Sequence, residues 1–147
     1  MMHPVRAGLA GLALTGALSL GGPSAARAET QAFAAPLAGT SEVPPNASPA
    51  RGEVRATYDT ATRALSWSGT YAGLTGPATA AHFHGPAEPG KNAGVMVPAP
   101  AAQSPFTGSA TLTEAQAAEL AGGRVYFNVH TAANPGGEIR GQMVKAP

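Results

Sequence analysis

The stretch RVYFNVHT, residues 124–131, is the clearest strand in this chain. Its apolar residues Val125, Phe127 and Val129 alternate with Arg124, Tyr126, Asn128 and His130. Because successive side chains of a strand point to opposite faces, this pattern predicts a β-strand with one face in a hydrophobic core. A turn cluster at residues 134–137 follows, and residues 138–144 then alternate again as the last strand.

Earlier parts of the chain carry the same alternation in short runs. Residues 53–58 and 65–71 flank a turn at 59–63, and they predict a hairpin that buries Tyr58 and Trp67. Further strands are expected at residues 32–38, 79–84, 94–97 and 106–112, with Pro98 ending the strand at 94–97.

One helix interrupts this series of strands. Thr113 and Gln116 have the spacing of a capping box, and the following residues favour a helix over 114–121. Gly122-Gly123 is a typical helix stop. About seven or eight short strands and one short connecting helix predict an all-β fold, an antiparallel β-sandwich with Greek-key connections.

The first 28 residues have the order of a secretory signal peptide. Arg6 lies in a short basic region, residues 7–22 are small and apolar, and Ala26-Arg27-Ala28 is a typical cleavage site. The apolar run is too short and too rich in Gly and Ala to favour a membrane anchor. We therefore expect cleavage after Ala28 and a secreted or periplasmic protein, with residues 29–147 forming one domain.

Charge and cysteine content restrict what this mature domain can do. Without Arg6 and Arg27, seven of the nine Lys and Arg residues remain against eight Asp and Glu. The sequence has no basic cluster to bind nucleic acid or a membrane surface, and no second apolar run to span a bilayer. Cysteine is absent, which excludes disulfides, thiolate metal sites and cysteine nucleophiles.

The histidines point to a metal site. The chain has four, and the three outside the signal peptide are His82, His84 and His130. The first two form a His-x-His pair on a predicted strand, so both rings lie on one face. If this strand neighbours the strand that carries His130, all three imidazoles converge on one spot. Three imidazoles without a thiolate favour a copper or zinc ion.

Other features leave the chemistry of such a site open. Glu88, Met96 or water could supply a fourth ligand, and an open fourth position would be typical of a catalytic site. The alternative is that the three histidines only form hydrogen bonds. No nucleophile elbow, P-loop or dinucleotide motif occurs. Glu138 and Arg140 share a strand face, and we expect a solvated ion pair.

Four segments resemble the chordin-type (CHRD) domain, occur in the family's order and cover almost all of the mature chain. They are residues 39–45 (GTSEVPP), 81–86 (AHFHGP), 125–131 (VYFNVHT) and 134–142 (NPGGEIRGQ). The resemblance implies an extracytoplasmic β-sandwich module. It does not imply an activity.

A fainter resemblance is to copper superoxide dismutases, which are Greek-key sandwiches with a His-x-His pair, a late histidine and an arginine after it. His82, His84, His130 and Arg140 match in type and order. The chain differs by lacking the cysteine pair, the zinc-loop ligands and a fourth histidine.

Three functions are compatible with these observations. The first is a secreted or periplasmic module, not an enzyme, that binds copper or zinc through His82, His84 and His130. The second is a copper-dependent oxidoreductase of the dismutase kind. The third is a structural or adhesive surface module without a metal.

Overall fold

The computed structural model describes residues 27–100 and 103–147. Nearly all of the predicted signal peptide, residues 1–28, lies outside this range. Within it, no helix is both long enough and apolar enough to cross a bilayer.

The described residues confirm an all-β fold with one α-helix. The strands are β1 (Thr30–Ala38), β2 (Arg51–Asp59), β3 (Ala64–Ala72), β4 (Ala78–His84), β5 (Val95–Ala99), β6 (Phe106–Thr111), β7 (Tyr126–Thr131), β8 (Ile139–Gln142) and β9 (Val144–Lys145). A 3-10 turn, η1 (Gly39–Ser41), follows β1, and the helix is α1 (Glu114–Ala121). The strand expected at residues 138–144 is divided in two, because Met143 is completely buried and its N–H donates to Val125.

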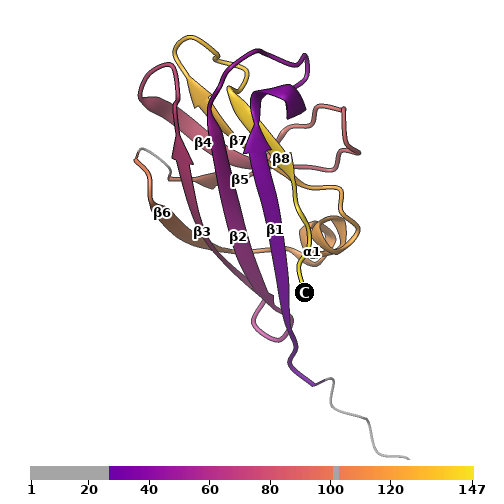
Figure 1. Ribbon diagram of the computed structural model, residues 1–147. Coiled ribbons are helices and arrows are strands. Elements are labelled where there is room, and N and C mark those ends of the chain that lie inside the picture. The colour runs from indigo at the N-terminus through magenta and orange to yellow at the C-terminus, as the bar shows by residue number, and fades with distance from the viewer. Residues whose placement is uncertain (1–26, 101–102) are drawn as a thin grey trace, which may run out of the picture.

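These nine strands form one sheet that folds over on itself. The order is β5-β4-β7-β8-β1-β2-β3-β6, every pair is antiparallel, and β9 pairs with β1. In Figure 1 the half with β1, β2 and β3 lies in front of the half with β4 and β7. Strands β3 and β4 are consecutive in the chain but belong to opposite halves, so the connection between them crosses from one layer to the other.

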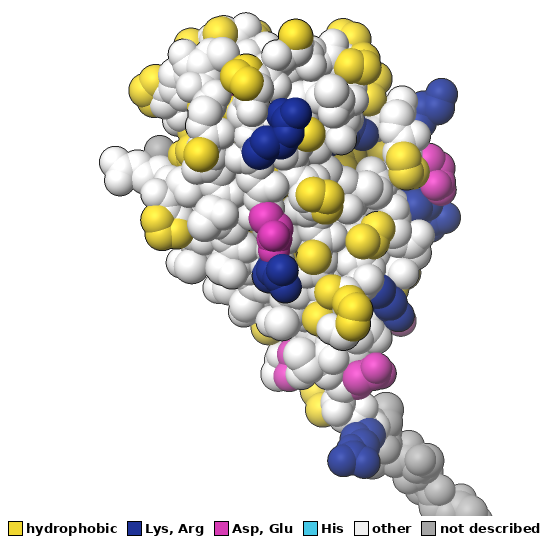
Figure 2. Space-filling model, viewed as in Figure 1, with side chains coloured by type: hydrophobic (Ala, Val, Ile, Leu, Met, Phe, Trp, Pro, Cys, Tyr) yellow, Lys and Arg dark blue, Asp and Glu magenta, His cyan; other side chains and the backbone are white. Residues whose placement is uncertain are grey.

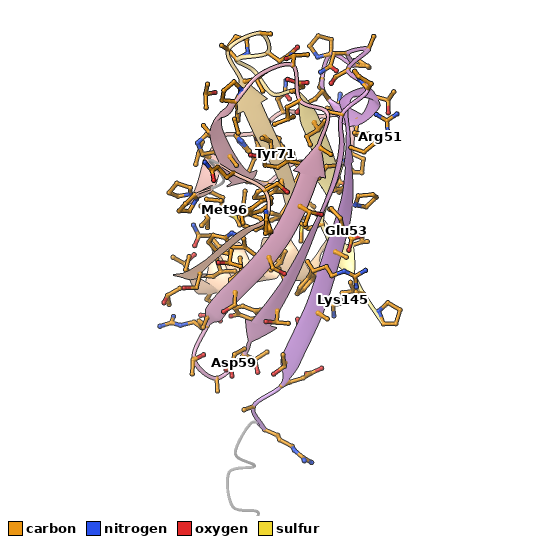
Figure 3. All side chains as sticks on the ribbon, turned by 60° about the vertical axis from the view of Figure 1, so that its left-hand side comes forward. Arg51, Glu53, Asp59, Tyr71, Met96 and Lys145 are labelled. Carbon is orange, nitrogen blue, oxygen red and sulfur yellow. The ribbon has the colours of Figure 1, made fainter. Side chains whose placement is uncertain are left out.

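The core lies between the two halves and is built around Trp67. The indole of Trp67 meets Phe83 edge to face, with ring centroids 5.0 Å apart. Phe127 lies 4.8 Å from Phe83 and stacks on Phe106 at 5.6 Å, which joins β4, β7 and β6. Gly108 packs flat against Trp67, because a Cβ atom there would come within 2.4 Å of the indole. Figure 3 shows side chains filling this layer along the length of the strands, from Arg51 at one end to Asp59 at the other.

The expectation that Pro98 ends its strand was wrong. Pro98 lies inside β5, opposite His82 of β4. Proline has no N–H to donate, so it is accepted in a sheet only where one side of the strand needs no partner. Strand β5 is at the end of the sheet order, and this position meets that condition.

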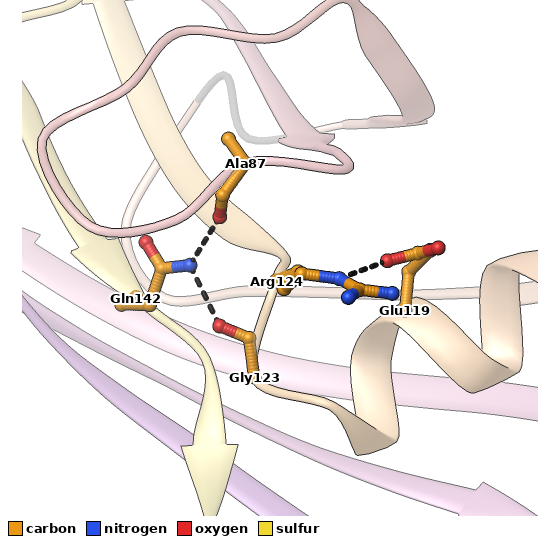
Figure 4. A network of polar contacts seen from close by, with 5 residues as sticks. All are labelled: Ala87, Glu119, Gly123, Arg124 and Gln142. Carbon is orange, nitrogen blue, oxygen red and sulfur yellow. Dashed lines mark hydrogen bonds and ion pairs between the residues drawn. The ribbon is translucent and has the colours of Figure 1, made fainter.

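The helix and its ends agree with the sequence prediction. The Thr113 hydroxyl accepts from the Gln116 N–H, and the Gln116 side chain accepts from the Thr113 N–H, which completes the capping box. Gly123 adopts a φ of +72° just after the helix, as is common at a helix stop. Figure 4 shows the Arg124–Glu119 ion pair at 2.6 Å and the Gly123 carbonyl held by Gln142.

Glu138 does not form the predicted ion pair with Arg140. Its side chain is completely buried, and its carboxylate accepts hydrogen bonds from three hydroxyls and one N–H. The donors are Ser48 Oγ (2.7 Å), Thr75 Oγ1 (2.7 Å), Thr131 Oγ1 (2.6 Å) and the Thr75 N–H (2.9 Å). The carboxylate therefore ties the loop before β2 and the loop before β4 to β7. The donors are short polar side chains from three separate segments of the chain. The spacing of Glu138 and Arg140 does not reveal these partners.

Replacement of Trp67 by alanine should lower the free energy of unfolding by about 3–5 kcal/mol, as large-to-small changes at buried aromatics do. Trp67 is 4% exposed. The matched control is Ser66→Ala on the outward face of the same strand, which should change stability by no more than about 0.5 kcal/mol. Urea denaturation measures both. Equal effects of the two substitutions would contradict the strand facing described above.

Glu138→Gln should destabilise the protein by about 1–3 kcal/mol at pH 7, because the amide cannot accept all four hydrogen bonds. Burial raises the pKa of the Glu138 carboxyl, but the hydrogen bonds from Thr131, Ser48 and Thr75 outweigh it and lower the pKa to about 2. A carboxyl with a lowered pKa stabilises the fold above the pKa of the unfolded state, and that stability is lost on acidification. Wild-type stability should thus fall between about pH 4.5 and pH 2, more steeply than that of Glu138→Gln. Parallel curves over this range would disprove the role of the charge.

Candidate functional site

The pairing of β4 with β7 positions the three histidines. In this antiparallel pair His82 lies opposite Asn128, His84 opposite Tyr126, and Ala80 opposite His130. Residues directly opposite each other share a face of the sheet. All three histidines therefore lie on the face away from the core, while Phe83 and Phe127 pack into it. The two strands are neighbours, which is the condition under which the sequence analysis expects the three imidazoles to converge.

The three imidazoles meet at one point on this face. One nitrogen from each ring lies within 4.8 Å of the other two. His82 Nδ1 and His130 Nε2 are 3.1 Å apart, and the ring centroids are separated by 5.3 Å (82 to 84), 5.0 Å (82 to 130) and 6.1 Å (84 to 130). The geometry thus brings together the three side chains that the sequence singled out. Whether they bind an ion remains a prediction.

The cluster is more buried than its position on the outer face of a sheet suggests. His84 and His130 are 7% and 9% exposed, and His82 is half-buried. Burial lowers the pKa of His82, as do the neighbouring His130 and His84. Burial also lowers the pKa of His84, although its hydrogen bonds to Ala93 and Asn128 raise it. The pKa is lowered overall in both residues. A lowered pKa favours the neutral imidazole, which is the form that binds metals.

Backbone carbonyls orient two of the rings. His130 Nδ1 lies 2.9 Å from the Pro135 carbonyl oxygen, and His84 Nδ1 lies 3.0 Å from that of Ala93. A carbonyl oxygen only accepts, so His130 Nδ1 carries the proton and His130 Nε2 keeps its lone pair. A histidine that ligates a metal usually has its other nitrogen held in this manner. His84 differs, because both of its nitrogens face acceptor oxygens, the Ala93 carbonyl and Asn128 Oδ1.

The Nε2 atoms of His130 and His84 already have hydrogen-bonding neighbours. His130 Nε2 accepts the hydrogen bond from His82 Nδ1, because its own proton is on Nδ1. His84 Nε2 lies 2.9 Å from Asn128 Oδ1. An ion at the centre would replace the proton between His82 and His130. To ligate it through Nε2, His84 would have to give up its contact with Asn128 Oδ1 and present that nitrogen without a proton.

One aromatic and one cationic side chain, Tyr126 and Arg140, extend the cluster. Sequence reasoning missed their arrangement. The ring of Tyr126 stacks on His84 at 4.7 Å with an interplanar angle of 6°. The Arg140 guanidinium carbon lies 3.4 Å from the centre of the Tyr126 ring. Tyr126 occupies the same face of its strand as His130, which is visible in the sequence pattern. The pairing of β8 with β7 adds Arg140, opposite Asn128, and this requires the tertiary structure.

The other candidates from the sequence lie outside the cluster. Met96 packs against the hydrophobic core. Among the described residues, the group able to hold a metal contains the three histidines and no carboxylate, so Glu88 is not part of it. Arg140 is 2% exposed and held by Asn92 and the Lys91 carbonyl. The Tyr126 ring lies between it and His84, which leaves Arg140 poorly placed to attract an anion to the histidine cluster.

The site lies away from the face formed by β1, β2 and β3. That face shows scattered Lys, Arg, Asp and Glu side chains among small apolar ones, and no histidine is visible on it in Figure 2. The cluster is covered by the loop between β4 and β5, since Ala93 of this loop contacts both His84 and the Tyr126 hydroxyl.

Comparison with known proteins identifies the family but no individual relative. No curated protein and no solved structure matches the chain. Residues 33–143 match the CHRD domain. This range runs from β1 to the residue after β8 and includes the three histidines, Tyr126 and Arg140. CHRD domains are typically extracellular modules. The match covers most of the chain, and the protein therefore belongs to the CHRD domain family.

Proposed function

We propose that this CHRD-family protein is an exported module that binds one transition metal ion through His82, His84 and His130. The observation that carries the proposal is the convergence of three imidazole nitrogens within 4.8 Å. The carbonyl contact of His130 supports it, because it leaves the His130 Nε2 lone pair on the side of the cluster.

The donor set favours copper or zinc. Imidazole suits both ions, whereas calcium and magnesium require oxygen ligands. Two nitrogens each ~2.0–2.1 Å from a tetrahedral zinc ion are about 3.4 Å apart. The 3.1 Å between His82 and His130 is already close to this spacing, so His84 is the ring that must approach. Copper should bind more tightly than zinc by the Irving–Williams order.

A dismutase activity has no comparable support. Steering of superoxide requires an accessible positive charge near the ion. The Arg140 guanidinium is instead buried over Tyr126 and engaged with the loop between β4 and β5. We therefore propose a binding module in preference to an oxidoreductase. A structural or adhesive module without a metal remains the alternative that titration would identify.

Isothermal titration of the metal-free mature protein with Cu²⁺ and Zn²⁺ should give one ion per chain. His82→Ala, His84→Ala and His130→Ala should each weaken binding by more than about a hundredfold, since loss of a ligand costs at least as much as loss of its supporting hydrogen bond. Glu88→Ala is the matched control and should bind like the wild type. Bound ion should also raise the thermal midpoint of the wild type but not that of the three histidine variants.

Two results would contradict this proposal. Wild-type affinity in all three histidine variants would place binding elsewhere. No heat of binding and no thermal shift with either ion would favour the structural module.

Export is the second component of the proposal, supported by the contacts of Glu29 with the β2–β3 turn. The Glu29 backbone nitrogen donates to Thr60 Oγ1 at 2.9 Å and its carbonyl accepts from the Thr60 N–H at 3.0 Å. The residue after the predicted cleavage site thus takes part in the fold. Intact-mass measurement of the exported protein should show Glu29 as its first residue. A mature protein that still contains Met1 would disprove cleavage.

A further inference from the structure

A cavity lies beside the histidine cluster, and none of the three histidines lines it. Its volume is about 390 Å³, and it lies between the segment of residues 40–45 after β1 and the loop between β4 and β5. Its polar lining comes from Glu42, Arg140 and Gln142 together with the hydroxyl residues Thr40 and Ser41. Its apolar lining comes from Val43, Pro45 and Pro89. Cavities of this size with a few convergent polar groups are typical of sites for small ligands.

Arg140 carries a buried charge that forms no close ion pair, although the Glu42 carboxylate in the same cavity attracts it. The described residues contain two ion pairs, Arg55–Glu53 and Arg124–Glu119, and neither involves Arg140. Its guanidinium donates to Asn92 Oδ1 at 2.9 Å and to the Lys91 carbonyl, and it lies over the Tyr126 ring. These partners are neutral. Because buried charges are normally paired, a guanidinium that lines a cavity in this state is suited to an anion.

The neighbouring groups restrict the anion further. The amide nitrogen of Gln142 is used by the carbonyls of Ala87 and Gly123, both at 2.8 Å, and Figure 4 shows its oxygen turned away from them. Glu42 is 5% exposed, and its Oε1 has no hydrogen-bond donor among the described residues, although the Asn128 side chain faces it. The Glu42 carboxylate near Arg140 repels anions, and it repels a doubly charged ligand such as phosphate more strongly than a singly charged one.

The apolar part of the lining also bears on the ligand. Val43, Pro45 and Pro89 offer no hydrogen-bonding side chain, so they suit a short hydrocarbon body. We propose that this cavity binds a small monocarboxylate, with its carboxylate at Arg140 and its apolar body against Val43, Pro45 and Pro89.

Butyrate is a suitable probe, and NMR titration of the ¹⁵N-labelled, metal-free mature protein at constant ionic strength and pH 8 is the test. We expect saturable shifts of the amides of Thr40, Ser41 and Gly90, which line the cavity. The β2–β3 turn at residues 59–63 serves as an internal reference and should not respond. Butylammonium has the same tail with the opposite charge and should cause no saturable shift. Phosphate should bind at least about tenfold more weakly than butyrate, because of its second charge.

Two variants test the role of charge without depending on each other. Arg140→Gln should abolish the butyrate response. Arg140→Gln also removes contacts to the loop between β4 and β5, so a loss of binding has two explanations. Glu42→Gln is the complementary variant, because it is expected to strengthen butyrate binding. Burial raises the pKa of Glu42 to about 7 against the attraction of Arg140 and the contact with Asn128, so it is mostly ionised at pH 8. Its replacement should tighten butyrate binding about tenfold.

The control for independence from the metal site is His82→Ala, which should bind butyrate like the wild type. Failure of the metal proposal would then leave this result unchanged. The proposal is overturned if butyrate and butylammonium shift the same amides equally, if no cavity amide shifts, or if Glu42→Gln leaves the affinity unaltered.

Discussion

The pairing of β4 with β7 is the constraint on which the rest of the molecule depends. Its register places Phe83 and Phe127 in the core and, on the other face, sets His82, Asn128 and His84 beside one another. A shift by one residue would exchange these two faces, moving the imidazoles into the core and the phenyl rings outward. The aromatic contacts that join β4 and β7 to Trp67 and Phe106 of the other half stabilise this register, and hence the geometry of the histidine cluster.

The outer face of this half is polar but covered. Strand β8 adds Arg140 beside Asn128 and Gln142 beside Tyr126, so that three strands present polar side chains to the loops above them. Glu138, Arg140 and Gln142 each hold one or more of these loops by hydrogen bonds. The turn before β8 passes close to this layer at Gly137, where φ is +130° and a Cβ atom would lie 2.3 Å from the Glu42 carboxylate. Only glycine fits there without displacing the polar network.

The two proposed sites share one structural element. Tyr126 stacks on His84 on one side and under Arg140 on the other, so the histidine cluster and the cavity are separated by a single ring. Ala93 strengthens this arrangement, since its carbonyl accepts from both His84 and the Tyr126 hydroxyl. A rigid aromatic ring between two binding positions gives each a fixed wall. In this chain the stack gives a physical role to Tyr126 and Arg140, which lie in the two late segments that resemble the CHRD domain.

The amino-acid sequence by itself determined the local structure. Period-two alternation predicted the strands, the Thr113–Gln116 pair predicted the helix start, and the spacing of His82 and His84 placed both rings on one face. These features depend on neighbours in the chain. Only the tertiary structure decided that β4 lies beside β7, that Pro98 belongs to an edge strand, and that Glu138 and Arg140 have separate buried partners. Except for Thr131 of β7, which is 7 residues from Glu138, the hydrogen-bonding partners cited here come from loops 48 to 90 residues away in the chain. No local pattern encodes which distant polar groups will meet, because strand order and loop packing determine it.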